Sequence, residues 1–275
     1  MSRFVRRGRH RQIRQMLGAA LAMLSCGASR AATPAAPTST VVGRLDVTAP
    51  LLAADSSRAR RLFVWLPADY DSTHRYPVLY MPNGQDLFDT ATAAGGEEWG
   101  IDELLAARPA GIPELIVVGI EAAPHAIDDY APPGSRDGAS GAAYVDFLTT
   151  IVKPYVDRHY ATRAEPDWTW IAGDGSGAAI VLYAAWTHAD VFGAGIALSV
   201  PDLDRAALAW ARVPPANATP RLWIDQLGSG TIATPSTTDL YGLLSKGARV
   251  QFHIAGSHTY RLVRLATALR SLAAP

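Results

Sequence analysis

The residues that bear most directly on chemistry in this 275-residue chain are Gly173 to Gly177, which read Gly-Asp-Gly-Ser-Gly. An apolar, β-prone run precedes them and an alanine-rich run follows. A strand, a sharp turn and a helix in this order form the context in which a G-x-S-x-G motif presents a nucleophilic serine. Here the middle position is Gly175, and Ser176 comes one residue late. The spacing predicts the turn of a nucleophile elbow without a serine at its apex.

Ser176 and Asp174 each leave two interpretations open. Ser176 is either a displaced nucleophile or an early helix residue that helps to cap the helix. A shift of one position turns a helical side chain by about 100°, which favours the capping role. Asp174 precedes the apex, so it is interpreted as a solvated turn residue, with a carboxylate nucleophile as the alternative.

His258 is the candidate general base, because it follows an expected strand and a glycine at a strand–loop–helix junction. With nothing to activate, it could equally be a histidine without a catalytic role. Asp225 ends the preceding expected strand and either orients His258 or, as favoured, makes a structural hydrogen bond. His253 lies within a strand and is expected to pack.

Other chemistries find little support. The only cysteine is Cys26, no phosphate loop ends in Lys-Ser/Thr, and no histidine–carboxylate cluster has metal-ligand spacing. We therefore expect no cofactor and no metal ion. Most of the seven tryptophans are expected in the core, with Trp99 the one that lines a cleft.

The first 31 residues have the composition of a secretory signal. They contain seven arginines and no acid, with an apolar stretch over 16–28 followed by small residues. This predicts a periplasmic or secreted protein, and lipidation of Cys26 is the alternative. Once the signal is removed, 18 basic residues remain against 25 acidic ones, a net charge of −7. That charge argues against nucleic acid or an anionic membrane as partner.

The remaining chain predicts a linker and N-terminal strand region over 32–57, then one α/β domain over 58–275, with no further membrane-spanning segment. Strands and helices alternate, which is typical of a largely parallel sheet covered on both faces. Besides the elbow strand, we expect strands over 61–66, 76–81, 115–120, 194–200, 221–225 and 250–254. Helices are expected over 98–107 and 142–159, after the elbow, between the last two strands, and from about Thr259.

An ordered series of segments resembles the putative-esterase family of α/β-hydrolases, which includes enterochelin-esterase-like and feruloyl-esterase-like proteins. The segments are Tyr76–Asp89, Ile116–Ile120, Asp129–Pro132, Tyr144–Leu148, Lys153–Asp157, Asp190–Gly193 and Leu198–Ser199. The resemblance implies an α/β-hydrolase fold and a serine carboxylesterase that acts on a small-molecule or sugar-linked ester. It also implies an oxyanion hole formed by the backbone N–H groups of Gln85 and Ser176.

The departures from that family fall on the catalytic positions. Aligned without a gap, Gly175 takes the nucleophile position, and no carboxylate follows Asp225 where the family's acid is expected. Asn83 replaces an aspartate, and Ala126 replaces an arginine. We therefore expect an esterase-like protein with impaired hydrolysis. The alternative is a non-catalytic relative that binds an ester-like ligand, a sugar-like ligand or a protein partner.

Overall fold

The computed structural model describes residues 38–52, 59–124, 126–136, 139–203, 205–228, 235–256 and 260–273. The predicted signal, with Cys26, lies outside these residues, as does His258. Within the described residues, every helix falls short of the length or hydropathy that crossing a bilayer requires.

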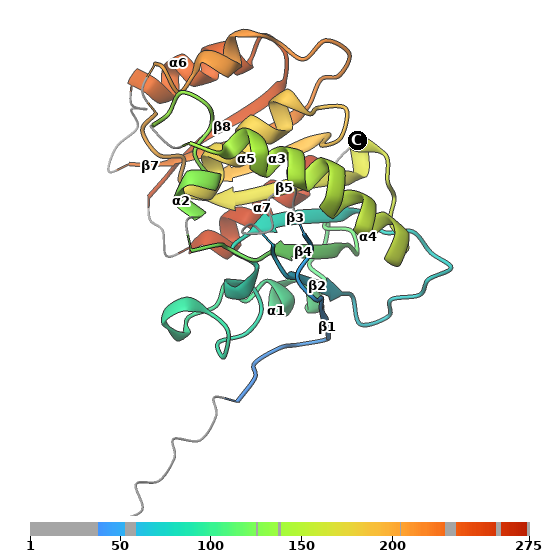
Figure 1. Cartoon of the computed structure of the whole chain (residues 1–275). Helices are drawn as coiled ribbons and strands as arrows, with labels where there is room; N and C mark the ends of the chain where they lie inside the picture. The colour runs from blue at the N-terminus through green and yellow to red at the C-terminus, as the bar shows by residue number, and fades with distance from the viewer. Residues whose placement is uncertain are drawn as a thin grey trace, which may run out of the picture. The chain divides into compact units, whose positions relative to one another are not determined.

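The core of the fold is a single eight-stranded sheet in the order β1-β2-β4-β3-β5-β6-β7-β8 (Figure 1). β2 runs antiparallel to both of its neighbours, and the strands from β4 to β8 pair in parallel. The strands are β1 (Arg44–Val47), β2 (Leu62–Leu66), β3 (Val78–Pro82), β4 (Ile116–Ile120), β5 (Thr169–Asp174), β6 (Ala194–Leu198), β7 (Arg221–Leu227) and β8 (Arg249–Ala255). The predicted, largely parallel sheet is confirmed.

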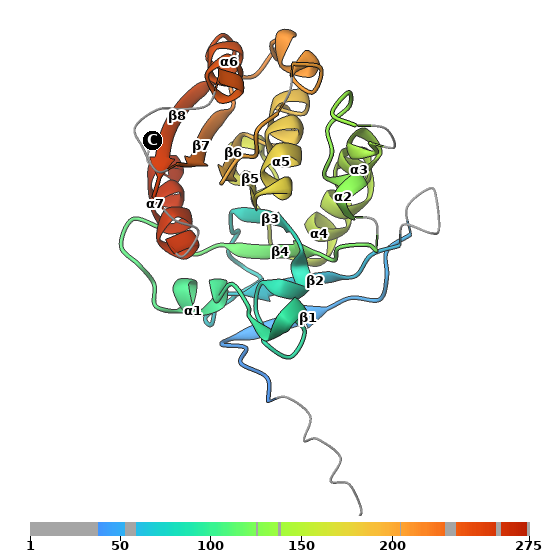
Figure 2. The ribbon, with the colours of Figure 1, turned by 90° about the vertical axis from the view of Figure 1, so that its left-hand side faces the viewer.

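Helices cover both faces of the sheet (Figure 2). They are α1 (Ile101–Ala106), α2 (Ala126–Asp129), α3 (Gly141–Phe147), α4 (Lys153–His159), α5 (Ser176–Thr187), α6 (Pro235–Leu244) and α7 (Arg261–Ala273). α3 to α6 pack on one face, where Val78 and Tyr80 of β3 are buried. α1 and α7 pack on the other face against Leu79 and Met81. Buried residues on both sides of β3 explain its continuous apolar sequence.

Two predicted helices differ from those observed. The helix expected over 142–159 consists of α3, a π-helical turn over Leu148–Val152, and α4. Pro154 in the first turn of α4 has no N–H to continue the preceding hydrogen-bond pattern, which accounts for the interruption. The helix expected over 98–107 begins only at Ile101, because Gly100 has a left-handed conformation with φ 72°.

Candidate active site

The Gly-rich turn joins the end of β5 to the start of α5, at the edge of the sheet where ligands of parallel α/β folds bind. Gly175 is its apex, with φ 57° and ψ −123°, a backbone conformation that side chains rarely adopt. The Gly175 N–H donates to the Leu198 carbonyl at 3.0 Å, and its carbonyl accepts from the Ala178 N–H at 3.0 Å. The strained strand–turn–helix of a nucleophile elbow is thus present, and Gly175 occupies its apex.

The three glycines of the turn serve different purposes. A Cβ on Gly173 would lie 2.6 Å from the Gly177 carbonyl oxygen, so close strand–helix packing requires glycine there. A Cβ on Gly177 would lie 3.1 Å from Pro82 Cγ, a tight contact. A Cβ on Gly175 would meet no atom within 4 Å. The apex therefore has room for a side chain, and what the sequence lacks there is the functional group.

Ser176 is the first residue of α5 and is exposed. Its hydroxyl makes no hydrogen bond within the described residues, so the predicted capping role is wrong. The physical reason is position, since a capping side chain belongs to the residue before the first helical one, and that residue is Gly175.

A cavity of about 310 Å³ lies beside the turn. Its lining comes from the end of β3, the loop that follows it, the end of β5 and the start of α7, and includes Met81, Asn83, Asp86, Glu97, Trp99, Asp174 and Arg261. The Arg261 guanidinium lies 4.7 Å from the centre of the Trp99 ring and donates to the Glu98 carbonyl at 2.8 Å. Trp99 therefore lines a cleft, as the sequence predicted, and Arg261 covers one face of its ring.

Asp174 differs from the predicted solvated turn residue. It is the last residue of β5, it is half-buried, and it lies on the cavity. Its Oδ1 atom is buried and has no hydrogen-bond partner within the described part of the chain. The strand, rather than the turn, fixes its side chain, and so the carboxylate faces the cleft.

The loop after β3 contains Gln85, whose backbone N–H is the expected oxyanion donor. Gln85 lies in a 3-10 turn, Gly84–Asp86, where N–H groups at a helical start lack a partner within the helix. Its side chain is occupied: Oε1 accepts from the Ala122 N–H at 3.0 Å, and Nε2 donates to Asp86 Oδ2 at 2.9 Å. These bonds fix the turn and leave the backbone N–H as the group that could stabilise an oxyanion.

Asn83 and Tyr130 brace the same loop. Asn83 has a left-handed backbone with φ 59°, which asparagine tolerates. Its Oδ1 accepts from the Tyr130 hydroxyl at 2.9 Å, and its N–H donates to the Tyr130 oxygen at 3.3 Å. Burial raises the pKa of Tyr130, so the hydroxyl remains protonated and able to donate.

Asp225 is buried in an ion pair that the sequence did not predict. Its Oδ1 accepts from Arg264 Nη1 at 2.6 Å and from the Ser199 N–H at 2.6 Å. Burial raises the pKa of Asp225, although the Ser199 N–H and the Arg264 charge act in the opposite direction. The favoured structural role of Asp225 agrees with these bonds, and its partner cation is Arg264.

The sequence patterns did not predict a role for Arg264. It lies on α7, and its guanidinium also donates to Ser199 Oγ at 3.2 and 3.1 Å. The available signal was weak, namely two arginines three positions apart, Arg261 and Arg264, which share one face of a helix that follows the last strand. His253 stacks on Trp223 with ring centres 3.7 Å apart, as expected of a packed residue.

Both the sequence and the structure of this chain are similar to those of known proteins. Over 149 residues the chain is 28% identical to the uncharacterized protein YjcH of Bacillus subtilis (strain 168), a match covering 54% of this chain and 58% of YjcH. The structure is similar to a ferulic acid esterase from the anaerobic fungus Anaeromyces mucronatus, with TM-score 0.61 and 17% identity over 86% of this chain and 93% of that chain. It is also similar to the siderophore hydrolase EstB of Aspergillus nidulans, with TM-score 0.64 and 17% identity over 86% and 97% of the two chains.

These structural likenesses establish the α/β-hydrolase fold that the sequence predicted. Family membership rests on the sequence itself, because residues 54–229 match the model of the family described as "Putative esterase". The matched region includes β2 to β7 and the whole Gly-rich turn. The chain therefore belongs to the putative-esterase family.

Proposed function

We propose that this chain is an exported esterase-like protein that retains the family's ligand cleft but has impaired serine catalysis. The observation that carries the proposal is Gly175, which occupies the apex of the elbow and supplies no nucleophile. Nucleophilic ester hydrolysis needs an oxygen at this point, within reach of a base. Gly175 has the strained backbone conformation of the apex but no side-chain oxygen.

The environment of Asp225 supports the same conclusion. A triad acid holds the base histidine in the right tautomer and stabilises its positive charge. Oδ1 of Asp225 is instead shared by Arg264 and the Ser199 N–H. A carboxylate already neutralised by an arginine contributes less to stabilising an imidazolium.

We infer that the cleft binds a small aromatic ester or acid. Trp99 provides an apolar ring at the cavity, and the Arg261 guanidinium beside it provides a positive charge for a carboxylate or ester oxygen. A structure of the Anaeromyces mucronatus esterase contains ferulic acid, which makes ferulic acid the first probe. Titration with ferulic acid should quench tryptophan fluorescence, and Trp99→Leu should weaken binding. Sugar-like ligands and protein partners remain the alternatives.

Fluorophosphonate labelling tests the catalytic part of the proposal. The wild type should not react, and Gly175→Ser should become labelled, because the apex has space for the side chain. Gly175→Ala is the matched control, since it imposes the same backbone strain without a hydroxyl. An unlabelled Gly175→Ser protein with an unchanged melting temperature would contradict the proposal that the absence of a side chain at Gly175 is what prevents reaction with the probe.

The second candidate function is hydrolysis by Ser176 as a displaced nucleophile. One observation favours it, namely that the exposed Ser176 hydroxyl is not engaged in a hydrogen bond within the described residues. Labelling of the wild type that disappears in Ser176→Ala would establish this function and refute the impaired one.

A further inference from the structure

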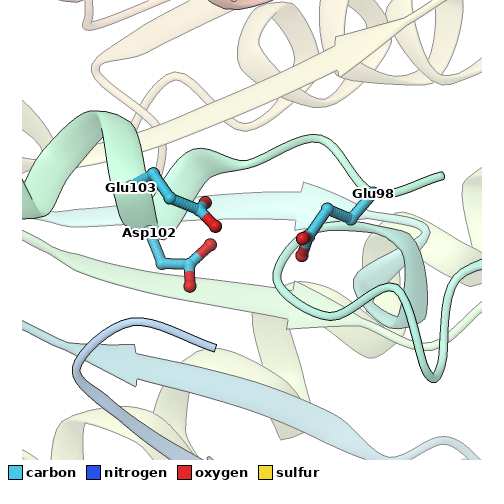
Figure 3. Close-up of side chains that lie close together, drawn as sticks. All are labelled: Glu98, Asp102 and Glu103. Carbon is cyan, nitrogen blue, oxygen red and sulfur yellow. The ribbon is translucent and has the colours of Figure 1, made fainter. Parts of the chain in front are cut away.

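Three carboxylates meet at the start of α1. Asp102 and Glu103 belong to α1, and Glu98 belongs to the loop before it (Figure 3). One oxygen from each lies within 4.8 Å of the other two. Oxygens bound to one calcium ion at 2.3–2.6 Å lie at most about 5 Å apart, so this spacing matches a shared ion.

Asp102 provides independent evidence that something belongs between these groups. Its side chain is 0% exposed, yet its Oδ1 atom has no hydrogen-bond partner within the described residues. Glu98 Oε2 is likewise buried and unpartnered there. Buried carboxylate oxygens normally accept hydrogen bonds or coordinate a metal, because leaving them without a partner is costly. Both of these oxygens belong to residues of the cluster.

Within the part of the chain that the structure describes, the negative charge of this cluster has no paired cationic side chain. Among the described residues, none of the three carboxylates forms a salt bridge with an arginine, lysine or histidine. Arg261 donates to the Glu98 backbone carbonyl and not to its carboxylate. The cluster needs a positive charge, and a cation would supply it.

The N-terminal segment completes the surroundings of the cluster. The Val42 N–H donates to Asp102 Oδ2 at 2.7 Å, and Thr40 Oγ1 donates to Glu98 Oε1 at 2.6 Å. These bonds hold two of the carboxylates in place while their other oxygens stay available. Hydrogen bonds that orient the coordinating oxygens are typical of structural metal sites.

We propose that Glu98, Asp102 and Glu103 bind a calcium ion, which joins the N-terminal segment to the start of α1. Calcium accepts carboxylate oxygens in an irregular arrangement and completes its six to eight ligands with water, for which the exposed side of Glu103 leaves access. Magnesium demands nearly ideal octahedral geometry and releases its water reluctantly, so it fits less well. Sequence spacing gave no sign of this site. The proposal is independent of whether the cleft hydrolyses esters.

Calorimetric titration of the chelator-treated, purified protein with calcium chloride tests the proposal. We expect one site per chain and a rise in Tm of roughly 5–10 °C at a calcium concentration about 100-fold above Kd. Glu103→Gln and Asp102→Asn should each weaken binding by about tenfold or more. Asp190→Asn, a change at an exposed acid far along the chain, is the matched control and should bind like the wild type.

Glu103 is the safer variant, because its side chain is exposed and the chain should fold without it. Terbium offers a second readout, since Trp99 directly follows Glu98 and should sensitise terbium emission on excitation of tryptophan. That emission should fall in Trp99→Phe while calcium binding persists. No heat and no change in Tm up to about 10 mM calcium would overturn the proposal. So would unchanged affinity in Glu103→Gln, or tighter binding of magnesium than of calcium.

Discussion

At the scale of single residues, the chemistry of this protein depends on what stands at two positions. Gly175 keeps the strained backbone of the elbow but provides no reactive atom. Asp225 keeps a carboxylate at the end of β7 but pairs it with Arg264. The side chains of this pair are 1% and 11% exposed, so the two charges lie in an environment of low polarity. There, each charge is tolerated chiefly because the other is present.

Removal of one partner of this pair should therefore be costly. Arg264→Met should lower the free energy of unfolding by about 3 kcal/mol, because it leaves a buried carboxylate uncompensated. The double variant Arg264→Met with Asp225→Asn should lose less than the two single variants together, by about 2 kcal/mol. Urea unfolding of all four proteins measures this coupling. Strict additivity would show that the two side chains stabilise the fold independently.

At the scale of elements, two junctions hold the site in place. One is the approach of α5 to β5, where Gly173 and Gly177 allow close packing. The other is the N-terminal segment before β1, which is bound to the loop after β3 through Asp89. Asp89 accepts from Ser39 Oγ at 2.7 Å, from the Thr40 N–H at 3.2 Å and from the Ala91 N–H at 2.9 Å. The same loop continues to Trp99, so this junction also positions the cleft.

Gly173→Ala should disturb the first junction. Its Cβ would lie 2.6 Å from a backbone carbonyl, which cannot move without shifting α5, so we expect a loss of about 2 kcal/mol in the free energy of unfolding. Gly242→Ala is the matched control within α6, where a Cβ meets nothing within 4 Å. That change should stabilise the protein by about 0.5–1 kcal/mol, because alanine favours a helix. A stable Gly173→Ala protein would show that α5 tolerates a shift.

Asp89 should make the second junction sensitive to acid. Burial alone would raise its pKa, but the hydrogen bonds from Ala91, Ser39 and Thr40 prevail and lower it. A lowered pKa in the folded state adds stability above the unfolded value of about 3.9, and this stability is lost as pH falls through the folded pKa. Asp89→Asn should therefore be less stable than the wild type by about 1–2 kcal/mol at pH 7.

The pH profile distinguishes this effect from simple loss of packing. The difference in unfolding free energy between wild type and Asp89→Asn should be constant above about pH 5 and should shrink as pH falls through the lowered folded-state pKa of Asp89. Asp190→Asn is again the control, because Asp190 is exposed. A difference that persists unchanged into acid would mean that the charge of Asp89 is not what matters.

At the scale of the whole molecule, the parallel sheet brings distant segments to one edge. The ends of β3 and β5, the loop before α1 and the start of α7 together line the cavity, although they span residues 81 to 261. The composition of residues 1–31 predicts an export signal before this domain. Beyond residue 31 the net charge is −7, from 18 basic and 25 acidic residues, and a negative charge disfavours binding to nucleic acid.

Export is tested on the full chain expressed in a Gram-negative host. The protein should be recovered from the periplasm or medium, with its N-terminal residue at or close to Ala32. Replacing Arg6 and Arg7 with glutamine should slow processing, because a basic n-region promotes export. Retention in the cytoplasm with an intact N-terminus would contradict the prediction that residues 1–31 are an export signal. Attachment of lipid at Cys26 would support the alternative, a lipid anchor.

The sequence by itself determined the fold class, the order of the elements and the register of the Gly-rich turn. These features depend on local patterns, namely apolar runs of strand length, glycines at the turn and an ordered series of family-like segments. Two predictions made from local patterns were wrong. The helix predicted over 142–159 contains a π-helical turn before Pro154, and Ser176 does not cap α5.

Only the tertiary structure decided which charges meet. Arg264 reaches Asp225 across 39 residues, and Thr40 reaches Glu98 across 58. Asp174 faces the cleft because β5 directs it there. Contacts of this kind form when the folded sheet and its helices bring together side chains that are far apart in the sequence. The spacing of residues within one segment therefore cannot predict them. The sequence therefore identified the glycine at the apex of the turn, while the fold revealed the Asp225–Arg264 ion pair and the cluster of Glu98, Asp102 and Glu103.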